Sequence, residues 1–208
     1  MALTDLFSNV SLVVRWLHVI AGITWIGLLY FFNFVNVPLQ GALDDAGKKA
    51  VNPKLMPRAL WWFRWGAMVT FLAGLALFTM TYAYTPGEGF GMNENFLLPG
   101  GELSDRAVWI LFGMLFATVM WFNVWFLIWP AQKKLLSGKA GDQAAALRQQ
   151  AGRFSRMNTY LSGPMLFGML APTHYGAVNG VTILVTIALG VFAIWWAIKC
   201  SFQVGKSV

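Results

Sequence analysis

Five long apolar runs, separated by polar stretches, dominate the pattern along this chain. A helix needs roughly 20 mainly apolar residues to cross the hydrocarbon core of a bilayer. The runs are apolar on every side, which favours helices over membrane strands, because such strands alternate in polarity. The first run is longer than the apolar part of a signal peptide, so we expect it to be a span. The predicted spans are about 12–37, 59–84, 106–129, 154–172 and 178–199.

These runs predict an all-α fold, an integral membrane bundle of five transmembrane helices that forms one domain over residues 1–208. Charges in the connecting stretches predict its orientation, because cytoplasmic loops collect Lys and Arg. We therefore place the N-terminus outside and the C-terminus in the cytoplasm. The basic residues of the two inner loops are Lys48, Lys49, Lys54, Arg58, Lys133, Lys134, Lys139, Arg148 and Arg153, and the acidic residues of the long outer loop are Glu88, Glu94, Glu102 and Asp105.

Composition agrees with a protein that lies in a lipid bilayer. Of the 208 residues, 58% are hydrophobic and only 11% are charged, whereas a soluble domain carries roughly 25% charge. The net charge of +7 is explained by the inner loops and does not indicate nucleic-acid binding. The single cysteine, Cys200, excludes a disulfide framework, a CxxC metal site and a covalently attached c-type haem.

The two histidines of the chain form the first group of candidate site residues. His18 lies about two turns into the first span, and His174 lies at the end of the fourth, so both are expected near the outer surface. Neutral imidazole is a common metal ligand, and haem iron takes axial histidine. Gly22 and Trp25 continue the helix face of His18, and a glycine there would let a flat macrocycle approach the backbone. The alternative is that each imidazole bonds a backbone carbonyl or faces water.

A second polar group is expected in the inner half of the bilayer. It contains two arginines, and the spans contain no Asp or Glu that could pair with them. Such guanidinium groups beside carboxamides suit an anion, because arginine presents a planar fork to carboxylate-like groups. The alternative is that the arginines reach lipid phosphate and the asparagines bond between helices. The group consists of Asn33, Asn36, Arg64, Asn123, Arg156 and Asn158.

Four ordered motifs give the chain a resemblance to a known family. They are RWLHVIAGITWIG (15–27), WWFRWGAMVTFLAG (61–74), NVWFLIWPAQKK (123–134) and SRMNTYLSGPMLFGM (155–169), the last followed by His174 and Tyr175. Together they resemble the N-terminal membrane domain of the bacterial membrane-bound urate oxidase (urate hydroxylase) family. The resemblance covers the first four spans and implies a multi-pass redox protein of the bacterial inner membrane. It carries His18 and His174 as functional residues, and Arg64, Asn123, Arg156 and Asn158 as matching positions.

Three functions remain open at this point. The first is a redox protein that holds a b-type haem between His18 and His174 and passes electrons to a separate periplasmic cytochrome c, as an oxidoreductase or its electron-transfer subunit. The second is binding of an anionic substrate, urate by resemblance, at the inner polar group. The third is a cofactor-free accessory subunit of a larger respiratory or photosynthetic membrane complex. A transporter is disfavoured, because the spans lack the paired carboxylates of a proton relay.

Overall fold

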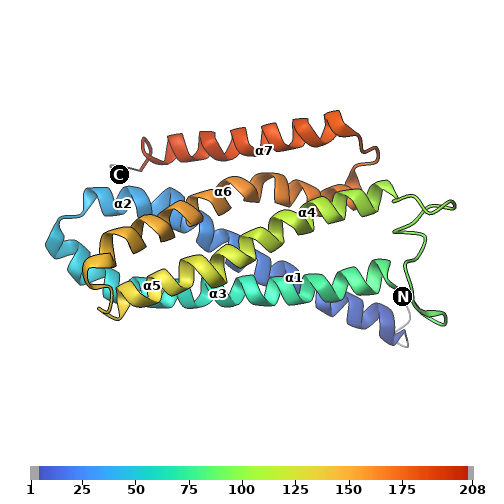
Figure 1. Cartoon of the computed structure of the whole chain (residues 1–208), viewed down its shortest axis with the longest axis horizontal. Coiled ribbons are helices and arrows are strands. Elements are labelled where there is room, and N and C mark those ends of the chain that lie inside the picture. The colour runs from blue at the N-terminus through green and yellow to red at the C-terminus, as the bar shows by residue number, and fades with distance from the viewer. Residues whose placement is uncertain (1–4, 206–208) are drawn as a thin grey trace.

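Helices make up nearly all of the chain in the computed structural model, which describes residues 5–205. Figure 1 shows the helices running side by side along one long axis. The elements are α1 (Leu6–Tyr30), η1 (Phe31–Asn36), α2 (Val37–Ala42), α3 (Asp45–Tyr82), β1 (Tyr84–Thr85), β2 (Gly89–Phe90), α4 (Asp105–Phe122), η2 (Asn123–Ile128), α5 (Trp129–Leu136), η3 (Gly141–Gln143), α6 (Ala144–His174) and α7 (Gly180–Ser201).

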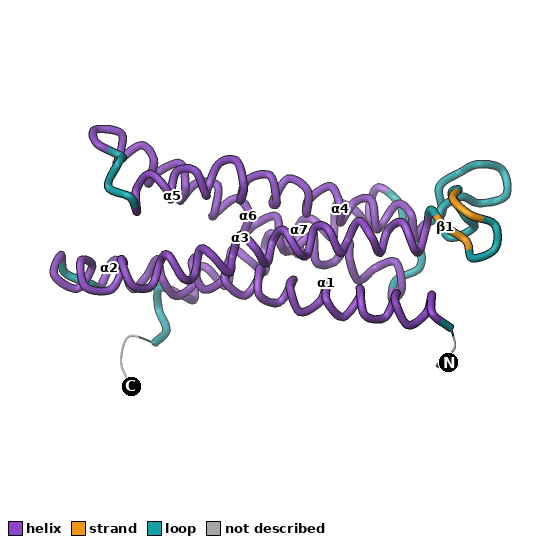
Figure 2. Tube along the Cα trace, turned by 90° about the horizontal axis from the view of Figure 1, so that it is seen from below, coloured by secondary structure: helices purple, strands orange, loops and turns teal. Residues whose placement is uncertain are grey.

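Two long hairpins form the body of the bundle. α1 packs along α3, α4 packs along α6, and α7 lies against α6 at one edge of the molecule. Figure 2 shows the short antiparallel strands β1 and β2 in the loop that covers the end nearest the N-terminus. The loops that carry the basic residues and the C-terminal end of α7 lie toward the opposite end of the bundle, which we call the inner end (Figure 1).

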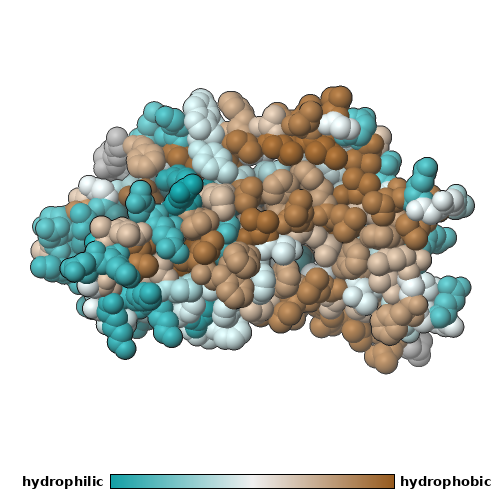
Figure 3. Space-filling model, in the orientation of Figure 1, coloured by the Kyte–Doolittle hydropathy of each residue, from teal (hydrophilic) through white to brown (hydrophobic). Residues whose placement is uncertain are grey.

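Four stretches are long and apolar enough to cross a membrane: Leu6–Ala42, Asp45–Tyr82, Asp105–Leu136 and Gly180–Ser201. Within residues 5–205 they contain the predicted first and third spans and most of the second and fifth, which end at Tyr82 and begin at Gly180 in the structure. The predicted fourth span lies within α6, which is helical but less apolar, because its first turns carry glutamines and arginines and its middle carries Ser, Asn and Thr. Figure 3 shows apolar side chains over the middle of the bundle and the N-terminal end, and polar side chains gathered at the other end.

α6 nevertheless makes the closest helix contacts of the bundle. A Cβ atom at Gly163 would lie 2.7 Å from the carbonyl carbon of Gly190 on α7. A Cβ atom at Gly113 on α4 would lie 2.9 Å from the carbonyl carbon of Gly168. Such approach of backbones at small residues is typical of helix packing inside membranes. α6 therefore packs closely between α4 and α7 along the apolar part of the bundle.

Two of the long helices widen into π-helical turns before a proline. The amide of Val37 donates to the carbonyl of Phe32, and that of Trp129 donates to the carbonyl of Val124, which are five-residue steps. Pro38 and Pro130 follow directly, and a proline has no amide hydrogen and crowds the preceding turn of a helix. Such π-helical segments frequently occur at functional sites. η1 contains Asn33 and Asn36, and η2 begins at Asn123.

Helix starts are fixed by polar caps, which the sequence supplies in most loops. The side chains of Asp5, Asp44, Ser104 and Asn179 each accept a hydrogen bond from a backbone amide in the first turn of the following helix. At Asp5, the hydroxyl and amide of Ser8 both donate to the carboxylate, which lowers its pKa. The cap at Asp44 starts α3 well before the predicted span.

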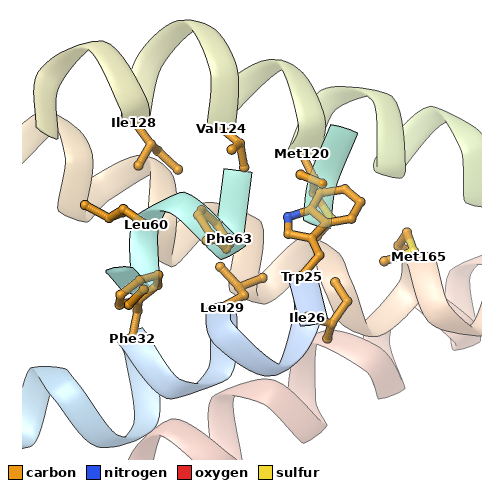
Figure 4. Close-up of a cluster of buried hydrophobic side chains, with 12 residues drawn as sticks. Trp25, Ile26, Leu29, Phe32, Leu60, Phe63, Met120, Val124, Ile128 and Met165 are labelled. Carbon is orange, nitrogen blue, oxygen red and sulfur yellow. The ribbon is translucent and has the colours of Figure 1, made fainter. Parts of the chain in front are cut away.

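The hydrophobic core lies in the middle of the bundle, between the two hairpins. Figure 4 shows Trp25 and Leu29 of α1 directed toward Phe63 of α3 and toward Met120 and Val124 on the α4–η2 rod. Trp25 is only 1% exposed. This core separates the end that carries His18 from the inner end that carries Asn33. Its packing fixes which faces of α1 and α3 lie against each other.

Candidate functional site at the inner end of the bundle

A cavity of about 320 Å³ lies at the inner side of this core, where the two π-helical segments face α3 and α6. Its volume is within the range of small-molecule sites. Aromatic and aliphatic side chains form one part of its wall and uncharged polar groups form another. Among the described residues, its lining consists of Phe32, Asn33, Asn36, Val37, Met56, Leu60, Phe63, Ile128, Gln132, Ala151, Gly152, Ser155 and Arg156.

Asn33 and Ser155 meet at the cavity wall. The amide nitrogen Nδ2 of Asn33 donates to the carbonyl of Leu29 at 3.0 Å and to Oγ of Ser155 at 2.9 Å. Both hydrogens of that nitrogen are thereby used. The acceptor Oδ1 of Asn33 and the hydroxyl hydrogen of Ser155 are left for another partner. The cavity wall can therefore offer an acceptor, Oδ1 of Asn33, and a rotatable hydroxyl donor, that of Ser155, at neighbouring positions.

Arg156 supplies the charge of the cavity. Its nitrogen Nη1 is shielded from solvent and has no hydrogen-bond partner. No Asp or Glu is present among the lining residues, so the guanidinium charge has no counter-charge there. A buried polar group without a partner is rare and costs free energy, and a charged one costs more. The cavity is therefore electrostatically suited to an anion.

Asn36 is held at the cavity by a small amide network. Its Oδ1 accepts from Nε2 of Gln40 at 3.2 Å. Gln40 and Asn52 also exchange two hydrogen bonds, of 2.8 and 3.0 Å, which join α2 to α3. Because these bonds cross the turn between the first two long helices, they fix the cavity wall on that side.

The structure separates the other members of the predicted inner group from this cavity. Asn123 donates from Nδ2 to Oδ1 of Asn158 at 2.7 Å, and Asn158 donates to the carbonyl of Met120 at 2.9 Å. Both side chains are buried and neither lines the cavity. They join η2 to α6, which is the packing role that the sequence left open for them.

Replacing Asn123 with alanine is expected to cost about 1–3 kcal/mol of stability, because Oδ1 of Asn158 would lose its donor while remaining buried. The measurement is thermal unfolding of the purified protein and of the Asn158→Ala and double variants. We expect the double variant to lose less than the sum of the single losses. Additive losses would contradict a direct bond between these side chains.

Arg64 also lies apart from the cavity. Its guanidinium carbon is 3.9 Å from the ring centroid of Trp129, and 5.8 and 5.9 Å from those of Trp125 and Trp65. Arg64 is not among the cavity residues, although its neighbour Phe63 is. Of the six residues in the predicted inner group, Asn33, Asn36 and Arg156 line the cavity and the other three do not.

His18 is oriented by α3. Its Nδ1 lies 2.9 Å from the carbonyl oxygen of Thr70. A carbonyl can only accept, so Nδ1 carries the hydrogen and donates, and Nε2 keeps a lone pair. This tautomer is the one that a metal-binding histidine commonly adopts when its second nitrogen is held by a backbone carbonyl. A Cβ atom at Gly74 would lie 3.0 Å from Cε1 of His18, so the glycine makes room for the ring.

His174 occupies a different setting. It is the last residue of α6 and its side chain is exposed. Figure 1 shows that α1 and α6 diverge toward this end of the bundle. The hydrogen bonds that join them, Tyr30 to Ser162 and Asn33 to Ser155, lie toward the inner end. Within residues 5–205, no contact joins the two histidines.

Gly22 and Trp25, predicted on the His18 face, pack on α3. A Cβ atom at Gly22 would lie 3.8 Å from the Thr70 methyl group, and Trp25 belongs to the core. Two polar cavity residues, Ser155 and Gln132, were not predicted as site residues. Both lie within quoted motifs, and the signal for Ser155 was its position beside Arg156 in the fourth motif.

Comparison with models of protein families assigns nearly the whole chain to the family that its motifs resemble. The model described as urate oxidase N-terminal matches residues 4–48, 40–98 and 98–207. The chain belongs to the urate oxidase N-terminal family. No curated protein and no solved structure matches the chain. Membership of this family, together with the four apolar helices, indicates a membrane domain of redox type.

Proposed function

We propose that this chain is the membrane domain of a urate-oxidising redox system and that it binds urate, or a closely similar purine anion, in the inner cavity. The observation that carries the proposal is the unpartnered guanidinium nitrogen of Arg156 at a cavity without acidic residues. The family supplies the substrate class. The guanidinium of Arg156 supplies a positive charge at the cavity, which a bound anion would neutralise.

The remaining walls suit a flat heterocycle with both donors and acceptors. Urate is a planar anion whose edge carries carbonyl oxygens and N–H groups. The fork of Arg156 and the hydroxyl of Ser155 would donate to the oxygens, and Oδ1 of Asn33 would accept from an N–H group. Phe32 and Phe63 line the same cavity and offer apolar surface to the ring. Binding there would hold the substrate at the inner end of the bundle.

For a haem cofactor, His18 is the residue that best fits an axial ligand, because its tautomer leaves Nε2 free to bind iron. A b-type haem held there would supply one-electron chemistry. His174 is the second histidine of the chain and our candidate for the other ligand, which requires that the diverging ends of α1 and α6 approach each other around the haem. We propose a cytochrome c on the periplasmic side as the electron acceptor.

This proposal includes five spans in the bacterial inner membrane, with the N-terminus outside. The close glycine contacts of α6 with α4 and α7 support a fifth crossing. The basic inner loops support the orientation. In this arrangement urate reaches the cavity from the cytoplasmic side, and His18 lies toward the periplasmic side.

The haem part of the proposal is tested by the visible absorption spectrum of the purified protein. We expect a reduced-minus-oxidised b-type spectrum in the wild type, its loss in His18→Ala and a changed spectrum in His174→Ala. Dithionite serves as the reductant, so the result does not depend on urate turnover. A colourless wild type that co-purifies in fixed ratio with an oxidase or reductase would contradict the haem proposal and favour the accessory-subunit alternative.

A further inference from the structure

Arg64 and three tryptophans form a second charged site on the bundle. The guanidinium of Arg64 lies over the ring of Trp129 and beside those of Trp65 and Trp125, at the seam between α3 and the η2–α5 rod. We call Trp65, Trp125 and Trp129 the Trp cage of Arg64. Ring faces attract a guanidinium, so the cage holds the arginine in one orientation.

The charge of Arg64 is not neutralised by the protein. No ion pair or hydrogen bond of its side chain is found within residues 5–205, and its Nε is shielded without a partner. The cage attracts the cation but supplies no acceptor for its N–H groups. A guanidinium has five such donors in a planar fork, the geometry that matches a phosphate. The guanidinium of Arg64 therefore has ring contacts but no hydrogen-bond acceptor, and an anion would supply that acceptor.

The surroundings of Arg64 face lipid. Trp61 and Trp65 on α3 are 48% and 41% exposed, and Phe126 on η2 is 55% exposed. Exposed tryptophans gather where hydrocarbon meets lipid headgroups. Arg64 lies five residues beyond Ala59, where the apolar part of α3 begins, which is about 8 Å into that segment at 1.5 Å per residue. An arginine at this depth reaches the headgroup region.

A second cation lies on the headgroup side of the cage. Lys133 is four residues after Trp129 on α5, so it lies on the same helix face one turn further inward, and it is exposed. Arg64 and Lys133 are both cations, and the described segments 59–82 and 123–136 contain no acid, so this face favours a lipid with net negative charge. A zwitterionic headgroup would bring its own cation toward them.

We infer that the Trp cage of Arg64 is a binding site for the phosphate of an anionic phospholipid in the inner leaflet. The guanidinium binds the phosphate, Lys133 adds attraction, and the exposed rings contact the acyl chains. This site is separate from the cavity of Arg156, since Arg64 is not among the residues that line it. The inference is independent of the proposed urate chemistry.

The test is native mass spectrometry of the full chain released from nanodiscs that contain equal amounts of phosphatidylglycerol and phosphatidylcholine. We expect wild type to retain phosphatidylglycerol at least fivefold in excess. Arg64→Ala should lose this excess, and Arg64→Lys should keep only part of it, because lysine lacks the fork. Arg58→Ala is the matched control: Arg58 is exposed on the same helix and donates to the carbonyl of Lys54 outside the cage.

Trp129→Leu provides a second variant that keeps the charge and removes the ring nearest to it, and it should also lower the excess. Added inorganic phosphate should not displace the retained lipid, because the free ion lacks acyl chains. Equal retention in wild type and Arg64→Ala would overturn the inference. So would displacement of the lipid by free phosphate, or loss of urate binding in Arg64→Ala with lipid retention unchanged.

Discussion

Replacing Arg156 with alanine is expected to weaken urate binding by roughly 10- to 100-fold, since a hydrogen bond to a charged group contributes about 1.5–3 kcal/mol. Arg156 is the only cation among the described residues that line the cavity. Its removal would also eliminate a shielded nitrogen, Nη1, that has no hydrogen-bond partner among the described residues. We therefore expect the variant to fold at least as well as wild type while its dissociation constant for urate rises.

Equilibrium binding of radiolabelled urate to the detergent-purified protein would measure this effect. Arg156→Lys should recover only part of the affinity, because an ammonium group cannot contact two oxygens in the manner of a fork. Arg64→Ala is the matched control, since it removes an arginine from the same bundle but not from the cavity. Equal affinity in Arg156→Ala and wild type would place the substrate elsewhere.

Replacing Gly163 with alanine is expected to destabilise the protein by at least about 3 kcal/mol, at the upper end for overpacked sites. The added methyl group would lie 2.7 Å from the carbonyl carbon of Gly190, which is backbone and cannot rotate away. α7 would have to move off α6 as a unit. Because α6 also forms the cavity wall through Ser155 and Arg156, we expect urate binding to fall with stability.

Gly27→Ala in α1 is the matched control for this change. No atom lies within 4 Å of a Cβ built at Gly27, so the substitution should be neutral or slightly stabilising through helix propensity. Thermal unfolding in the same detergent compares the two variants. Similar midpoints for Gly163→Ala and wild type would show that α6 and α7 do not pack as closely as the structure has them.

The sequence was sufficient to predict the long helices and their order along the chain. Apolar runs identified the four described stretches that can span a membrane, and the predicted fourth span identified the C-terminal part of α6. The helical extension of α3 before residue 59 was missed. The stretch that contains Lys48, Lys49 and Pro53 was interpreted as a loop. In the structure the cap at Asp44 starts a helix that continues through both of its internal prolines.

The direction of side chains around each helix could not be predicted. Arg64 and Arg156 have similar depth, which the sequence gives, but packing rotates Arg64 toward three tryptophans and Arg156 toward the cavity. His18 and His174 were likewise grouped by depth alone. The direction of the His18 ring depends on a backbone carbonyl, that of Thr70, and no sequence pattern marks that acceptor.

The π-helical segments explain why the cavity itself had no sequence signature. Five-residue hydrogen bonds before Pro38 and Pro130 change the rotation of Asn33 and Asn123 relative to a regular helix. Periodicity arguments assume 3.6 residues per turn, so they assign these side chains to approximate faces only. Asn33 meets Ser155 and Asn123 meets Asn158, although both asparagines were predicted in one group.

An experimental structure of the chain with urate bound would test the central claim most directly. The account predicts urate in the inner cavity, with the guanidinium of Arg156 on its oxygens and Asn33 and Ser155 within hydrogen-bond distance of its edge. Urate beside His174, or on the Trp cage of Arg64, with Arg156 still without a partner, would contradict it.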